Sequence, residues 1–170
     1  TFDNADFAFT KIVLAGDVVG LTVDNLDAGT IEVQDNQTAA IAVTSVGDED
    51  TLGLTINAEA ATTIADLDVT GVETVNVTTT ADTDDTTFTT IETDGVAALT
   101  FAGAGDIIIT DITDADATND ATVKIANIDL TGQTGGFEMT ANNLGYGTTF
   151  TLADLGEATA TYDFDDDTVN

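Results

Sequence analysis

Four clusters of acidic side chains are the part of this sequence with the clearest capacity for chemistry. They place Asp at adjacent or alternating positions, so a tight loop can direct several carboxylates at one centre. Calcium takes six to eight oxygen ligands, which carboxylates and backbone carbonyls supply. The sequence therefore predicts calcium binding, and the candidate ligands are Asp48, Asp50, Asp82, Asp84, Asp85, Asp111, Asp114, Asp116, Asp120, Asp163, Asp165 and Asp166.

Each cluster taken alone is equally compatible with a solvated turn, because Asp is a common turn residue. No cluster matches an EF-hand loop, and the glycine-rich nonapeptide of β-roll proteins is absent. The whole chain, however, carries 32 acidic residues against two basic ones, Lys11 and Lys124, for a formal net charge of -30. Repulsion on this scale opposes compaction, so we expect bound divalent cations or high salt to offset it.

The same composition removes most catalytic chemistry. The chain has no Cys, no His and no Arg, so thiol nucleophiles and the commonest general base are missing. Two lysines cannot neutralise a phosphate backbone, which argues against a nucleic-acid partner. Paired carboxylates would suit a glycosidase, but the chain has no Trp and only 6% aromatic residues to stack on a sugar. We therefore expect no enzyme.

Two further expectations concern location. No apolar run approaches the roughly 20 residues that span a bilayer as a helix, so we expect no membrane insertion. The sequence begins at Thr1 without a methionine or a signal peptide. This start indicates a processed protein or a piece of a longer one.

Short bursts of alternating apolar residues run through the chain, for example at residues 21–23, 31–33, 41–43 and 52–56. Each burst is bounded by Gly, Asp or Asn, which is typical of short strands. Thr, a β-branched residue that suits strands, makes up about a fifth of the chain. The Ala-rich stretch 57–68 has room for at most one helical turn, and the acidic stretch 78–90 is the best candidate for a long loop.

An imperfect repeat indicates how these strands are arranged. Residues 71–77 align with residues 95–101 at an offset of about 24 positions, a period found in stacked-coil proteins. Two bursts about ten residues apart would make one coil. We predict a single all-β domain over residues 1–170, folded as a parallel β-helix or β-solenoid, with residues 1–20 as an N-terminal cap or subunit contact. The alternative is a β-sandwich, which also has strands every 8–12 residues.

The phrase Gly-Val-Glu-Thr-Val-Asn-Val-Thr-Thr at residues 71–79, with the Thr-, Ala- and Asp-rich texture around it, resembles bacterial S-layer proteins. The similarity is to the calcium-binding, type I-secreted, RTX-related kind, although the glycine-rich calcium repeats are lacking. It implies a β-solenoid that assembles into a lattice when calcium is present.

The expected function is therefore a structural protein of the cell surface. It would self-assemble as a homo-oligomer into an extracellular array (an S-layer, filament or matrix), with Ca²⁺ bridging its acidic loops. The alternative is a calcium-stabilised repeat module of a large adhesin, which would bind a cell-surface polysaccharide or a surface protein.

Overall fold

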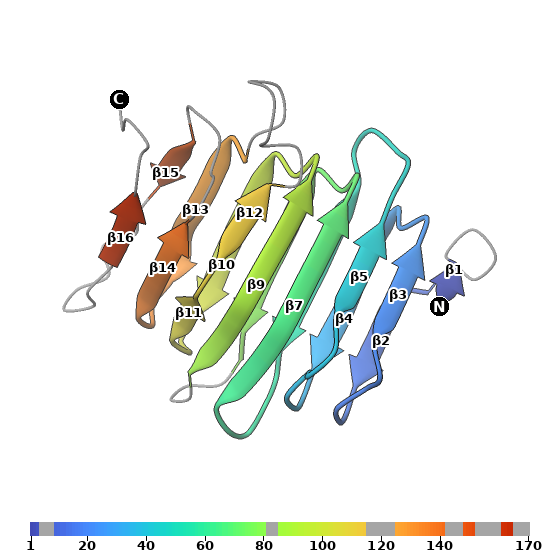
Figure 1. Cartoon of the computed structure of the whole chain (residues 1–170), viewed down its shortest axis with the longest axis horizontal. Helices are drawn as coiled ribbons and strands as arrows, with labels where there is room; N and C mark the ends of the chain where they lie inside the picture. Colours follow the sequence, from blue (N-terminus) through green and yellow to red (C-terminus); the bar gives the residue numbers. More distant parts are fainter. Residues whose placement is uncertain (4–8, 81–84, 115–124, 142–147, 152–160, 165–170) are drawn as a thin grey trace.

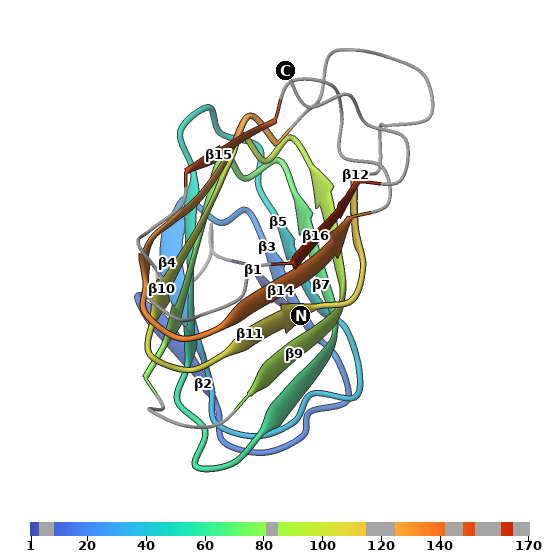
Figure 2. The same cartoon turned by 90° about the vertical axis from the view of Figure 1, so that its left-hand side faces the viewer.

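Two parallel β-sheets lie face to face and enclose the core (Figures 1 and 2). The computed structural model describes residues 1–3, 9–80, 85–114, 125–141, 148–151 and 161–164. Within these residues sheet A has nine strands and sheet B has seven. In Figure 2, the strands of sheet B lie at the left and most strands of sheet A at the right.

The chain alternates between the two sheets, apart from β11 and β12, which both belong to sheet A. In spatial order, sheet A consists of β1 (Phe2–Asp3), β3 (Leu21–Asp24), β5 (Ile41–Thr44), β7 (Thr62–Thr70), β9 (Thr86–Asp94), β11 (Ile107–Ile109), β14 (Phe137–Ala141) and β16 (Thr161–Phe164), with β12 (Ile112–Asp114) also paired to β9. Sheet B consists of β15 (Thr149–Thr151), β13 (Asn127–Gln133), β10 (Ala98–Gly103), β8 (Thr74–Thr79), β6 (Thr51–Ile56), β4 (Ala28–Val33) and β2 (Lys11–Leu14).

One strand from each sheet makes one coil of a solenoid. In sheet B, Ala28 pairs with Thr51, Thr51 with Thr74, and Thr74 with Ala98, so equivalent positions recur after 23 or 24 residues. Parallel strands need a crossover connection, and here the strand in the opposite sheet supplies it. The predicted β-solenoid is confirmed, as is the repeat that aligns residues 71–77 with residues 95–101.

Stacked apolar columns fill the space between the sheets. One column in sheet B contains Leu52, Val75, Leu99 and Ile128, in register on successive coils and at most 1% exposed. Side chains point to opposite faces at alternate strand positions, which explains the period-two bursts in the sequence. Each such buried side chain stabilises the fold by roughly 1.5–3 kcal/mol.

Glycine is required at the corners where the chain leaves sheet A. Gly71 has φ of 68°, and a Cβ atom there would clash with the Ser45 carbonyl oxygen. Gly95 follows one coil later with φ of 90°. These two glycines begin the two halves of the repeat. Each has the left-handed backbone conformation that residues with a side chain disfavour.

The structure corrects three expectations. A β-sandwich is wrong, because sandwiches are built from antiparallel sheets and each strand pair here is parallel. A loop over residues 78–90 is also wrong, since β8 ends at Thr79 and β9 begins at Thr86. No helical turn forms in residues 57–68, because β7 begins at Thr62.

The described residues contain no helix with the length and apolar character that crossing a membrane requires.

Candidate functional site

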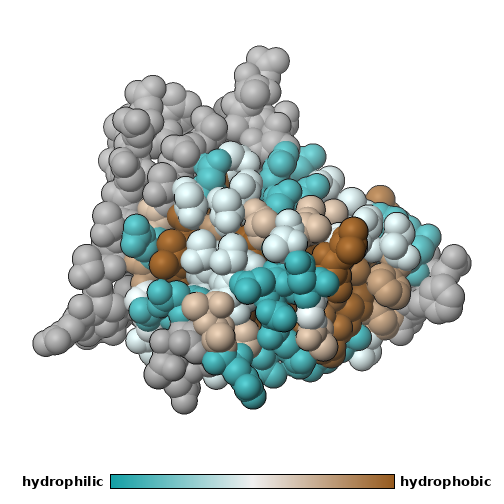
Figure 3. Space-filling view, turned by 60° about the horizontal axis from the view of Figure 1, so that its bottom comes forward, coloured by the Kyte–Doolittle hydropathy of each residue, from teal (hydrophilic) through white to brown (hydrophobic). Residues whose placement is uncertain are grey.

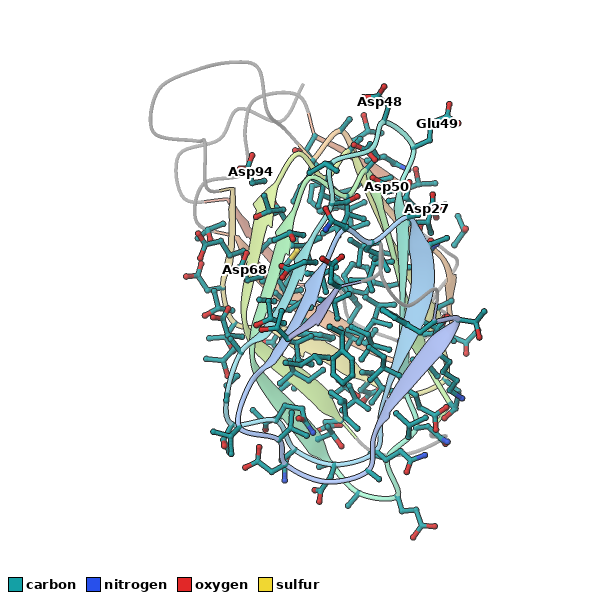
Figure 4. The ribbon with its side chains drawn as sticks, turned by 90° about the vertical axis from the view of Figure 1, so that its right-hand side faces the viewer. Asp27, Asp48, Glu49, Asp50, Asp68 and Asp94 are labelled. Atoms are coloured by element: carbon teal, nitrogen blue, oxygen red, sulfur yellow. The ribbon has the colours of Figure 1, made fainter. Side chains whose placement is uncertain are left out.

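The first predicted acidic cluster lies in the turn that joins β5 to β6. Asp50 is only 4% exposed, and its carboxylate accepts hydrogen bonds from the Ser45 hydroxyl and, at 3.0 Å, from the Gly47 backbone N–H. Short acidic side chains commonly stabilise turns in this way. The Asp50 carboxylate is therefore used within its own turn, whereas Asp48 and Glu49 are exposed and point outward (Figure 4).

Acidic residues stack at this corner on successive coils. The carbonyls of Asp27, Asp50 and Glu73 accept the hydrogen bonds that start β6, β8 and β10, at 3.1, 3.2 and 3.0 Å. The Asp50 backbone N–H also donates to the Glu73 carboxylate at 2.7 Å. We call this group, with Asp48 and Glu49, the acidic corner.

The acidic corner has the right atoms for calcium but not a closed site. Its carboxylates are the hard oxygen donors that calcium prefers. Among the described residues, however, no three acidic side chains converge so that they could hold one metal ion. The two candidate ligands here, Asp48 and Asp50, point in different directions, outward and into the turn. These two residues therefore do not make a calcium cage within one copy.

The remaining candidate ligands are dispersed or lie outside the described residues. Asp85 precedes β9, and its carbonyl accepts a hydrogen bond from Thr62 at 2.9 Å. Asp111 lies between β11 and β12, Asp114 ends β12 beside Thr93, and Asp163 lies in β16. The structure does not describe Asp82, Asp84, Asp116, Asp120, Asp165 and Asp166.

The outer face of sheet A carries acids that the sequence reasoning did not single out. Asp68 on β7 pairs in register with Glu92 on β9, and Asp94 lies at the end of β9. Burial, and then the neighbouring Asp68, raises the pKa of Asp66, one oxygen of which is buried without a hydrogen-bond partner in the described structure. The outward acids of sheet A, which we call the acidic face, are Asp3, Asp24, Asp66, Asp68, Glu92, Asp94 and Glu138.

The outer face of sheet B is the opposite. Its three central strands, β6, β8 and β10, present only small or uncharged residues to the outside. We call this surface the neutral face, and its residues are Thr51, Gly53, Thr55, Thr74, Asn76, Thr78, Ala98, Thr100 and Ala102. A shallow hollow of about 410 Å³ opens at the edge of this face towards β4, and its lining includes Thr30, Gly53 and Asn76.

Charges flank the neutral face at both ends. Lys11 on β2 forms an ion pair with Glu32 on β4. Lys11, followed by Asn57 and Gln34, lowers the pKa of Glu32 to about 2. At the other end, Asp129 on β13 accepts a hydrogen bond from the Thr131 backbone N–H at 2.8 Å, and the hydrogen bonds from Thr131 lower its pKa.

No protein-family model, curated protein or solved structure matches this chain.

Proposed function

We propose that this protein is a structural subunit of an extracellular, cell-surface array, and that it has no catalytic activity. Copies would join end to end, so that the coils of one subunit continue those of the next. The observation that carries the proposal is the N-terminal end of the solenoid. There, within the part of the chain that the structure describes, β1 and β2 each have one paired edge and lie beside exposed apolar side chains.

Among the described residues, the large exposed apolar side chains are concentrated at that end. Phe2 is 48% exposed, Val13 is 47% exposed and Val19 is fully exposed. All three lie in the first coil, whereas Val46, at 85%, lies in the turn after β5. Figure 3 shows a group of brown, apolar side chains right of centre, towards the N-terminal end of Figure 1, and a smaller group at the left. Such patches mark contact surfaces in soluble proteins.

The backbone at the same end is suited to strand addition. In the described structure, β1 is the last strand of sheet A and β2 the last strand of sheet B. An edge strand presents unpaired N–H and C=O groups that another chain can pair with. Stacked-coil proteins bury their apolar coil faces against neighbouring coils, so a second copy is the occupant that this end suits.

Calcium would control assembly through charge. A net charge of -30 opposes contact between copies, and divalent cations between carboxylates of neighbouring copies would offset it. Extracellular calcium modules bind at about 10⁻⁴–10⁻³ M, so assembly would follow export. The resemblance to calcium-binding S-layer proteins supports the same order of events.

Calcium add-back tests this proposal. The chelated protein receives calcium at constant ionic strength, circular dichroism follows the fold, and light scattering follows assembly. We expect millimolar calcium to produce large particles, whereas magnesium or extra sodium chloride should not. A β-strand signal in circular dichroism without large particles in light scattering would favour the adhesin module instead. Equal action of sodium chloride would indicate general charge screening, as in an ordinary protein of a halophile.

Substitutions at the N-terminal end test the contact itself. The double variant Val13→Thr/Val19→Asn removes apolar surface there, and we expect it to slow or abolish particle growth. Val46→Asn removes a comparable exposed side chain away from that end and is the matched control. If both variants assemble like the wild type, the N-terminal end is not the contact.

A further inference from the structure

The neutral face stands out against the charge of the chain. Nine outward positions on three adjacent strands carry no charge, in a chain with 32 acidic residues. A surface that only had to stay hydrated would be expected to share in those acids, as the acidic face of sheet A does. Charged residues are depleted at the centres of protein interfaces.

The chemistry of the neutral face is self-complementary. A Thr hydroxyl both donates and accepts hydrogen bonds, so two copies of a Thr-rich surface can pair with each other in a way that two acidic surfaces cannot. Gly53 leaves a hollow, and Asn76 on the next strand supplies a larger side chain. This surface therefore offers a second copy both a projecting side chain, Asn76, and a recess at Gly53.

The charges at the two ends fix the orientation. Lys11, Thr30, Gly53, Asn76, Thr100 and Asp129 form one outward column across six strands of sheet B, in that order. The column thus begins with a cation, which also pairs with Glu32 on β4, and ends with an anion. A two-fold axis parallel to the strands, between β6 and β8, reverses the order of the strands in the second copy. It places Lys11 of each copy opposite Asp129 of the other.

The same axis matches the rest of the column. Thr30 lies opposite Thr100 of the second copy, and Gly53 lies opposite Asn76, so the larger side chain faces the hollow. We propose that the neutral face of sheet B packs against the neutral face of a second copy in this two-fold arrangement, as the lateral contact of the array. This inference rests on the proposed assembly function.

The size of the contact predicts when it forms. The neutral face and the flanking strands β2, β4 and β13 together make six strands about 4.8 Å apart, and with three outward positions about 6.7 Å apart they cover roughly 500 Å² per copy. The total of roughly 1,000 Å² is near the lower limit for a specific interface. One contact alone is weak, but many contacts along a filament act together. Filaments should therefore form first and pair laterally afterwards.

A charge pair introduced across the contact tests both the surface and its register. Thr100→Asp and Thr30→Lys each leave an unpaired charge at the contact, so each should weaken lateral association about ten-fold or more. Within one copy the two positions lie on β4 and β10, three strands apart. The double variant Thr30→Lys/Thr100→Asp should restore pairing, because each Lys then faces an Asp of the second copy. Thr63→Asp, exposed on β7 of sheet A, is the matched control.

Electron microscopy counts paired and single filaments, and sedimentation at high protein concentration measures dimers directly. We expect paired filaments for the wild type and Thr63→Asp, single filaments for the two single variants, and pairing in the double variant. The inference is overturned if filaments of Thr100→Asp still pair, or if filaments of the double variant do not pair. If Thr100→Asp removes retention on a dextran column but not pairing, the face binds sugar instead.

Sedimentation separates this inference from the proposed function. One outcome is that the wild type forms dimers but no filaments, and that Thr100→Asp abolishes the dimers. This outcome would support the neutral-face contact and contradict end-to-end assembly. Filaments that never pair, together with no dimer at high concentration, contradict the neutral-face contact and leave end-to-end assembly in place.

Discussion

The two sheets of this solenoid are alike inside and different outside. Phe88 of sheet A and Phe101 of sheet B are both fully buried, and both sheets stack apolar residues in register. Outside, Asp68 and Glu92 lie side by side on sheet A, whereas the equivalent surface of sheet B carries Thr, Asn, Gly and Ala. The core demands the same alternation from both sheets, so it does not explain this difference. The difference between the two sheets therefore lies in their outer surfaces alone.

The largest effect is expected where the sheets are alike. Phe88→Ala and Phe101→Ala each remove a side chain that is 0% exposed. Each should lower the free energy of unfolding by about 3–5 kcal/mol. Phe101 also contacts Phe137 edge to face, with ring centroids 5.2 Å apart. Denaturant unfolding at fixed calcium measures both, and a much smaller loss in one of them would show that the two inner faces are not equivalent.

A smaller effect is expected on the acidic face. Like charges directly opposite on neighbouring strands are destabilising, so Asp68→Asn/Glu92→Gln should raise the free energy of unfolding by about 0.5–1 kcal/mol at low salt. In about 1 M salt the gain should shrink, because the Debye length falls to about 3 Å. Glu59→Gln removes an exposed turn charge and serves as control. An equal gain from Glu59→Gln would mean that total charge matters and the strand pair does not.

The next prediction concerns pH at the same face. Burial and Asp68 raise the pKa of Asp66, so the folded state disfavours its charged form, and Asp66 costs stability at neutral pH. Asp66→Asn should therefore raise Tm slightly at pH 7. The advantage should disappear as the pH falls through the raised pKa to below 3.8, the ordinary value. Thermal melts across this range measure it, with Glu49→Gln as control. A constant gain at every pH would contradict the assignment.

The smallest effect is expected beside the neutral face, at the ion pair. Because the pKa of Glu32 falls from 4.5 to about 2, its contribution to stability is present above pH 4.5 and is lost as the pH falls towards 2. Glu32→Gln should lower Tm slightly at pH 6 and have no effect near pH 2. Lys11→Gln should give a similar profile, since Lys11 is the first cause of the shift. An unchanged Glu32 titration in Lys11→Gln would contradict this cause.

Much of the fold could be predicted because apolar alternation and corner glycines repeat together. Residues 31–33 and 52–56 fall within β4 and β6, and Gly71 and Gly95 mark equivalent corners. Strand β9 was missed because it contains mostly Thr and acids. Thr86 faces inward in β9 and is 3% exposed, so a polar residue occupies a position where the pattern requires an apolar one.

The surfaces could not be predicted, because the imperfect repeat was found only for residues 71–77 and 95–101 and its offset was not extended to the neighbouring strands. Asp68 and Glu92 are 24 positions apart, and only the pairing of β7 with β9 brings them together. The neutral face likewise draws on three strands from three coils. The acidic clusters were visible in the sequence, but their directions were not: Asp50 turns into its loop while Asp48 points away (Figure 4).

Because β4, β6, β8 and β10 pair in a regular register, each coil adds the same increment to the length of the solenoid. Removing or duplicating a stretch of 23 residues between equivalent positions, such as Thr51 and Thr74, would change the length by one strand spacing, about 4.8 Å. The columns on both faces would stay in line. Unequal recombination in such a gene can therefore change the length of the molecule without altering its surfaces, whereas losing one residue within a strand would turn the following side chains of that strand to the other face.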